Sequence, residues 1–79
     1  MPKQTFFNLP SEKRALILEA ARQEFSEVTL QEASIANIIK RAGIPRGSFY
    51  QYFEDKDDLF LYLVEEAGKD FFERLIKIL

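Results

Sequence analysis

The fold of this chain is decided by residues 34–53, which read Ser34-Ile35-Ala36-Asn37-Ile38-Ile39-Lys40-Arg41-Ala42-Gly43-Ile44-Pro45-Arg46-Gly47-Ser48-Phe49-Tyr50-Gln51-Tyr52-Phe53. Apolar side chains recur there at helical spacing after Ser34, whose hydroxyl is suited to cap the N–H groups of a helix start. Gly43 tolerates the left-handed conformation that ends a helix sharply, and Pro45 fixes φ for the first turn of the next helix. The stretch therefore predicts two short helices, over about residues 34–41 and 45–52, joined by a tight turn.

A longer helix over about residues 10–27 is predicted before this stretch. It begins near Pro10 or Ser11, and its cap is either Ser11 itself or Asn8 with Pro10 in the first turn. Its apolar side chains share one face and are assigned to the core: Ile17, Ala21 and Phe25. The core also takes side chains from the two short helices: Ile35, Ile38, Phe49 and Phe53.

A fourth helix is predicted over about residues 55–79, with Asp55 as its N-cap and Asp57 and Asp58 in the first turn, where the helix dipole favours acids. Its apolar residues lie on more than one face, so it expects neighbours on more than one side. Three short helices can cover only its first half, and we expect something further to pack on residues 71–79. The predicted fold class is all-α, a small helical bundle with a helix-turn-helix over about 34–53.

Composition excludes several structural features and narrows the location of the protein. The chain has 79 residues, no cysteine and no histidine, which excludes disulfides and the usual zinc sites, and we expect one domain with no metal and no cofactor. No segment approaches the roughly 20 apolar residues of a membrane span, and the first seven residues lack the apolar run of a signal peptide. These features predict a cytoplasmic protein that does not enter the membrane.

An enzyme is not expected, because the chain has no histidine, no cysteine and no glycine-rich phosphate loop. The acidic cluster at residues 54–58 could in principle hold a divalent ion, but it lacks the spacing of a calcium-binding loop. Helix capping explains this cluster better.

Charge is distributed unevenly along the chain. The net charge is −2, which argues mildly against nucleic acid as a partner. However, residues 1–53 carry seven basic and five acidic side chains, and residues 54–79 carry four basic and eight acidic ones. Between Ala33 and Phe53 there are three cations, Lys40, Arg41 and Arg46, and no acid. A surface that faces phosphates should be cleared of negative charge in this way, although a solvated helix face explains three cations about as well.

The two short helices suggest DNA binding. The major groove, about 12 Å wide, admits one helix, and a helix before it can cross the backbone and hold the second one in place. Gly47 and Ser48 are small enough to let the second short helix approach base edges, and Arg46 beside them can reach guanine or a phosphate. A plain helical hairpin is the alternative interpretation of the pattern alone.

Between about Ser11 and Leu63 the sequence resembles the N-terminal region of the TetR family of transcriptional regulators. The most specific part is Gly43-Ile44-Pro45-Arg46-Gly47-Ser48-Phe49-Tyr50-Gln51-Tyr52-Phe53 followed by Asp55-Lys56. The resemblance implies a DNA-binding domain over residues 1–54. It also implies that residues 55–79 form a linking helix, the start of a C-terminal effector and dimerisation domain that lies beyond this chain.

The resemblance implies a role for each matching position. Arg46, Gly47 and Ser48 would face the major groove, and Gln51 and Tyr52 would contact bases or backbone at the end of the short helix. Arg46 and Gln51 are the candidates for reading the base sequence.

Other matching positions would contact the DNA backbone, which positions the domain without reading sequence. Ser34, Ala36 and Asn37 would sit against phosphates and one base, and Tyr50 would donate its hydroxyl to a phosphate. Lys56 would meet a phosphate beside the N-terminus of the fourth helix.

Several of these positions also have a purely structural interpretation. Tyr50 and Tyr52 fit half-buried core rings, and Ser34 fits a helix cap with no other role. Lys56 is then a surface cation among acids, and Gly47 relieves crowding between the two short helices.

The sequence departs from the family pattern in three places. Thr29 stands where members often have glycine, and a β-branched residue is costly at positive φ, so the loop 27–33 is expected to take another path. Ile39 replaces a usual alanine and asks for more room. Pro45 replaces a frequent serine and removes one side-chain cap.

Family members carry a larger C-terminal domain that forms a homodimer and binds a small effector. The resemblance therefore implies a palindromic double-stranded DNA operator and, most commonly, a repressor that the effector releases. The rival hypothesis is a helical protein-interaction module that uses the exposed apolar surface of residues 71–79.

Overall fold

The computed structural model describes residues 1–78, which form five helices: α1 (Gln4–Phe7), α2 (Ser11–Glu27), α3 (Ile35–Ala42), α4 (Arg46–Tyr52) and α5 (Lys56–Ile78). No strand occurs among these described residues, and the predicted all-α fold is confirmed. The four predicted helices appear within about one residue of their predicted bounds, inside the usual uncertainty of helix ends. Leu79, the last residue of the fourth predicted helix, lies outside the described residues.

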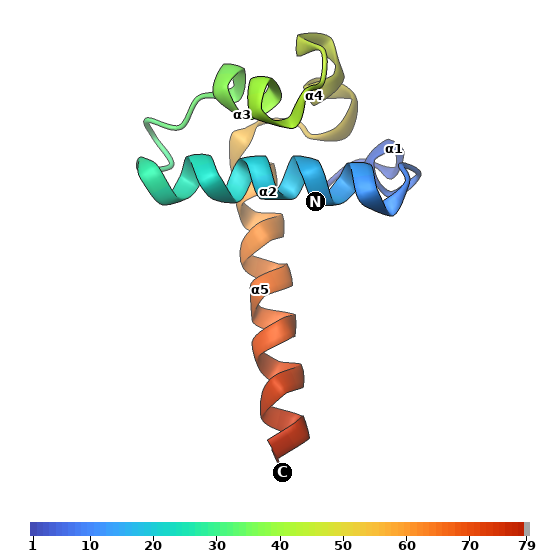
Figure 1. The fold of residues 1–79 in the computed structure, drawn as a ribbon, viewed down its shortest axis with the longest axis vertical. Helices are drawn as coiled ribbons and strands as arrows, with labels where there is room; N and C mark the ends of the chain where they lie inside the picture. The colour runs from blue at the N-terminus through green and yellow to red at the C-terminus, as the bar shows by residue number, and fades with distance from the viewer. Residues whose placement is uncertain (79) are drawn as a thin grey trace.

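The helices are arranged around α2 (Figure 1). The short helices α3 and α4 lie along one side of α2, and α5 passes behind α2 and runs away on the other side. The longest extent of the molecule, 44 Å against 29 and 18 Å, follows α5. The far end of α5 is therefore well separated from the pair α3–α4.

The core lies between α2 and the helices that flank it, and every helix contributes to it. The largest fully buried side chains are Phe6, Ile17, Ile38, Phe49, Phe53 and Leu59. The ring of Phe53 packs between two other rings, with centroid distances of 5.0 Å to Phe6 and 5.5 Å to Phe49. The predicted core residues Ile17, Ala21, Ile38, Phe49 and Phe53 are all buried, and Ile35 and Phe25 are partly buried against the same cluster.

Helix α1 was not predicted from the sequence. Four residues are too few to make a stable helix alone, because the first turn costs more than it gains. Phe6 holds α1 in place: its ring is fully buried and lies 5.8 Å, centroid to centroid, from that of Tyr62 on α5. The helix therefore forms because of tertiary packing, and no local sequence pattern predicts it.

Helix caps decide where the elements begin and end. Ser34 Oγ accepts a hydrogen bond from Asn37 N–H at 3.2 Å, and Asp55 Oδ1 accepts one from Asp58 N–H at 2.8 Å, so both predicted caps are confirmed. The predicted cap of the first long helix is wrong. Pro10 occupies the cap position of α2 without a side-chain hydrogen bond, so neither Ser11 nor Asn8 serves, and Asn8 Oδ1 instead accepts from Gln4.

The loop before α3 has ordinary backbone geometry. Among the described residues only Gly43 has a positive φ, so Thr29 avoids the left-handed conformation that glycine would permit. Its carbonyl accepts hydrogen bonds from the N–H groups of Glu32 and Ala33, at 3.1 and 2.9 Å. Its hydroxyl also donates to the Glu32 carboxylate at 3.1 Å. The expected alternative path is a polar turn that Thr29 itself stabilises.

The two halves of α5 have different surroundings. Leu59 is fully buried in the common core, and Tyr62 and Leu63 pack against it, so the first turns of α5 belong to the same packed unit. Beyond them Phe71, Phe72 and Ile76 are 65%, 63% and 54% exposed. The prediction that the short helices cover only the first half is confirmed, whereas the domain division at residue 54 stays a prediction. None of the helices over residues 1–78 combines the length and the apolar character that a bilayer crossing requires.

Candidate nucleic-acid interface

Helices α3 and α4 are joined by a tight turn at Gly43. Its φ of 72° places it in the left-handed region, and the N–H of Ile44 returns to the Ile39 carbonyl at 3.1 Å. Ile44 is buried and anchors the turn in the core. Pro45, with φ −64° and no side-chain cap, precedes α4, as expected when proline stands in place of serine. Helices α3 and α4, with the turn between them, thus form a helix-turn-helix that packs on α2.

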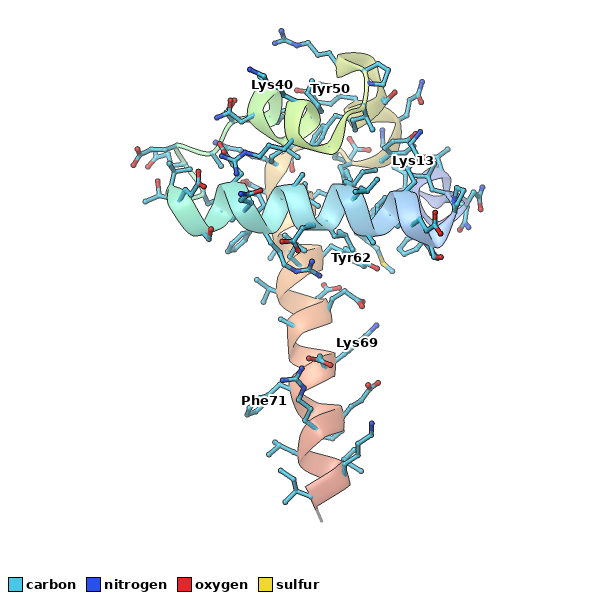
Figure 2. The ribbon with its side chains drawn as sticks, in the orientation of Figure 1. Lys13, Lys40, Tyr50, Tyr62, Lys69 and Phe71 are labelled. Atoms are coloured by element: carbon cyan, nitrogen blue, oxygen red, sulfur yellow. The ribbon has the colours of Figure 1, made fainter. Side chains whose placement is uncertain are left out.

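The short helix α4 is anchored on one side and open on the other. Phe49 and Tyr52 are buried. The remaining residues face outward, with Ser48 half-buried and four others exposed: Arg46, Gly47, Tyr50 and Gln51. We call these four exposed residues, with exposed Ala36, Asn37 and Lys40 of α3, the reading face. In Figure 2, Lys40 and Tyr50 lie at the same end of the molecule, opposite Lys69 and Phe71.

Tyr50 belongs to this open surface and not to the core. Its side chain is 52% exposed, and its ring meets the buried Phe49 ring edge-on at a centroid distance of 5.3 Å. The interpretation of Tyr50 as a core ring is therefore wrong. A hydroxyl on a half-exposed, laterally supported ring is well placed to donate to a phosphate.

Gly47 has no internal packing role. A Cβ added at this position would meet no heavy atom within 4 Å, and its φ is not in the left-handed region. The interpretation that Gly47 relieves crowding between the helices is therefore wrong. The space beside Gly47 is therefore open on the outer side of α4.

Tyr52 lies on the other side of the helix. It is 8% exposed, and its ring lies 6.5 Å, centroid to centroid, from the Phe6 ring. Of the two interpretations of Tyr52, the structure favours packing, because a ring buried against Phe6 of α1 has little surface left for DNA.

The start of α3 is held by a residue that the sequence analysis missed. Glu24 of α2 is 3% exposed, and its carboxylate accepts hydrogen bonds from Ser34 N–H at 2.8 Å and from Asn37 Nδ2 at 3.3 Å. A carboxylate that replaces lost water with such donors is tolerated in the interior. One signal was available in the sequence: Glu24 follows Ile17, Ala20 and Ala21 at helical spacing on the buried stripe.

Ser34, next to the reading face, and Asn37, which belongs to it, therefore both have structural roles. Ser34 is half-buried and caps α3, and the side-chain amide of Asn37 is turned toward Glu24. Ala36 is exposed at the start of α3. This first turn is thereby fixed to α2 before any ligand binds.

The three cations of the acid-free stretch have different surroundings. Arg41 donates to Glu27 at 2.8 Å and lies 3.8 Å from the Glu24 carboxylate. The hydrogen bond to Glu27 is the main reason that the pKa of Arg41 lies above its ordinary value, and the charge of Glu24 adds to it. Among residues 1–78, Lys40 and Arg46 form no ion pair, so they are the two cations of this stretch that remain available to phosphates.

Lys56 is neither a free cation nor simply one charge among acids. Its ammonium group donates to the carbonyls of Gln31 and Ala33, at 2.7 and 3.1 Å. It thereby connects the first turn of α5 to the loop that leads into α3. The side chain is half-buried and committed to this contact.

These features define a helix-turn-helix protein in which one side of the second helix of the motif, α4, is exposed to solvent. Residues 17–63 match the family model described as "Bacterial regulatory proteins, tetR family". Because this match spans more than half of the chain, the protein belongs to the TetR family, and the resemblance stated above is confirmed.

Several known proteins are similar to this chain. An uncharacterized HTH-type transcriptional regulator of Bacillus subtilis (strain 168), YvdT, is 45% identical over 65 residues, covering 82% of this chain and 31% of that protein. The HTH-type transcriptional regulator BetI of Yersinia pestis (strain Pestoides F) is 39% identical over 61 residues, covering 72% of this chain and 31% of BetI. The crystal structure of a TetR family transcriptional regulator from Chloroflexus aurantiacus J-10-FL superposes with a TM-score of 0.92 at 44% identity, covering 98% of this chain and 36% of that one. The chain thus spans about a third of the length of these relatives.

Proposed function

We propose that residues 1–78 form the DNA-reading head of a bacterial transcriptional regulator, with α4 in the major groove and α3 against the DNA backbone. The observation that carries this proposal is the two-sided character of α4. Phe49 and Tyr52 anchor the helix in the core, while Arg46, Gly47, Tyr50 and Gln51 remain exposed. A helix held in this way presents its outer side to a groove about 12 Å wide without rearrangement.

Each residue of the reading face takes a role that its chemistry fits. Arg46 and Gln51 are the candidates for base edges, since a guanidinium pairs with guanine and a primary amide with adenine. Gly47 and half-buried Ser48 allow close approach of the α4 backbone. Tyr50 donates its hydroxyl to a phosphate.

Helix α3 supplies the contacts that fix orientation. Its exposed Ala36 and Asn37 lie in the first turn, where the positive end of the helix dipole favours a phosphate. The backbone N–H and the side-chain amide of Asn37 are already bonded to Ser34 and Glu24, so these two groups are not counted as phosphate donors. Lys40, exposed and without an ion pair among the described residues, adds a cation to the same end of the molecule. Ser34, Tyr52 and Lys56 stay outside the proposed direct contacts, because the structure uses each of them internally.

The intact protein is proposed to be a homodimer that binds a palindromic operator in the cytoplasm. It would act as a repressor that a small effector releases. Family membership supports this part of the proposal. In the structure, α5 begins beside the loop before α3 and ends far from the reading face, which suits a mechanical link between a distal effector site and DNA.

Selection of random duplex DNA by the intact protein, at about 0.1 M salt, tests the proposal, because non-specific phosphate binding is weakened there but not abolished. We expect an enriched palindrome. Replacing Arg46 by Ala should lower the affinity for it by about 1–3 kcal/mol and relax the preference at one base position. The Tyr50→Phe variant should bind more weakly with unchanged preference.

A matched control is Arg74→Ala, which removes an exposed arginine from the far end of α5, where it pairs with Asp70 at 3.1 Å. This variant should bind as the wild type does. If no sequence is enriched although circular dichroism shows intact helices, DNA reading is refuted. The second candidate, a protein-interaction module, then gains support from the exposed Phe71, Phe72 and Ile76 of α5.

A further inference from the structure

The last turn of α4 is capped by a segment that lies more than forty residues away in the sequence. A helix leaves its last four carbonyl groups without partners inside the helix. In α4 the Phe49 carbonyl accepts from Phe53 N–H at 2.9 Å. The other three accept from the N-terminal segment: Lys3 Nζ donates to the Tyr50 carbonyl at 2.7 Å, Thr5 Oγ1 to that of Gln51, and Lys3 N–H to that of Tyr52 at 2.8 Å.

This N-terminal segment, residues 3–7, is itself firmly held. Phe6 is fully buried, with its ring 5.0 Å from that of Phe53, centroid to centroid. The buried ring fixes α1 against the end of α4, so Lys3 and Thr5 lie beside the carbonyls to which they donate. The hydrophobic and the polar contacts therefore act together on the same turn.

A cap matters more for α4 than for most helices. With seven residues it is too short to be stable alone, and its end frays unless something holds it. Tyr50 and Gln51, both proposed to contact DNA, lie in this last turn. If the turn frays, each binding event must order it again and loses affinity accordingly.

We propose that Lys3 and Thr5 are positioning residues for DNA reading, which hold the last turn of α4 in its binding conformation. This inference rests on the proposed function for its consequence on DNA, but the cap itself is a property of the free protein. The rival role for Lys3 is a direct phosphate contact. That role predicts a smaller dependence of affinity on salt when the charge is removed, whereas a cap predicts an unchanged dependence.

The first experiment is amide hydrogen exchange on the intact protein without DNA. The variants Lys3→Met and Thr5→Val should speed exchange of the amides at residues 50–53 by about three- to tenfold, the effect of one lost hydrogen bond. The amides of α3 should keep their protection, and Thr5→Ser should restore wild-type exchange. The control Lys69→Met, on α5 and 3.5 Å from Glu66, should change nothing in α4. Unchanged protection of α4 in both cap variants would overturn the proposal.

The second experiment measures affinity for the selected palindrome over a range of salt. Lys3→Met and Thr5→Val should each bind about three- to tenfold more weakly, with the salt slope of the wild type. A reduced slope for Lys3→Met together with normal binding by Thr5→Val would assign Lys3 to a phosphate and overturn the positioning role. Faster exchange with unchanged affinity would overturn it as well. If the wild type selects no DNA, the proposed function fails, while the exchange data still decide whether the cap exists.

Discussion

Glu24 is the position where a single change should show most directly how the motif is held. Its buried carboxylate is the acceptor for Ser34 N–H and for the side-chain amide of Asn37. Replacing Glu24 by Ala removes the acceptor of both hydrogen bonds and leaves the partly buried N–H of Ser34 without a partner. The start of α3 then loses its connection to α2.

The expected cost follows from these contacts. A buried donor left unsatisfied costs about 1–3 kcal/mol, and the lost packing of the side-chain stem adds to it. Arg41 keeps its hydrogen bond to Glu27 at 2.8 Å, so no buried cation is stranded. We therefore expect Glu24→Ala to lower the free energy of unfolding by about 2–3 kcal/mol, which for a domain of this size lowers Tm by about 10–20 °C. The Glu24→Gln variant keeps one acceptor oxygen for Ser34 N–H and should lose about half as much.

Thermal unfolding followed by circular dichroism measures this effect. The matched control is Glu19→Ala, on the same helix, where the carboxylate is 72% exposed and pairs with Arg22 at 3.1 Å. An exposed pair of this kind contributes about 0–1 kcal/mol, so the control should melt within a few degrees of the wild type. Equal melting temperatures for Glu24→Ala and Glu19→Ala would refute the assigned role of the buried carboxylate.

Two glycines of the motif should respond in opposite ways. Gly47→Ala places a methyl group in open space, so it should leave the free energy of unfolding unchanged or raise it by up to about 1 kcal/mol through helix propensity. Operator affinity should fall, because the methyl group meets DNA. Normal affinity of that variant would show that DNA does not approach α4 there. Gly43→Ala should lower the free energy of unfolding by about 1–2 kcal/mol, because alanine is strained at a φ of 72° even though the space around it is open. Gly43→Asn should lower it less, because asparagine tolerates this left-handed conformation better. Equal free energies of unfolding for Gly43→Ala and Gly43→Asn, measured by chemical denaturation, would contradict this account of the turn.

The sequence alone determined the elements whose signals are local. Apolar spacing in α2, α3 and α5, the hydroxyl of Ser34, the flexibility of Gly43 and the carboxylate of Asp55 act within a few residues of the chain. Such short-range chemistry is present in the unfolded chain as well, so it can be recognised without knowing the fold. The exposed side of α4 also followed from this level, because Phe49 and Phe53 already marked its buried side.

The contacts that the sequence did not reveal join residues far apart along the chain. Only the tertiary structure places Phe6 against Phe53, commits Lys56 to the loop before α3 and brings Lys3 to the end of α4. For Tyr52 the sequence left packing and DNA contact both open, and the structure decided for packing. Each of these depends on how the helices pack, and no local pattern encodes which donor will meet which acceptor. Local chemistry therefore determined which helices form in the motif, and the packing of α1, α2 and α5 decided how firmly the reading helix is held.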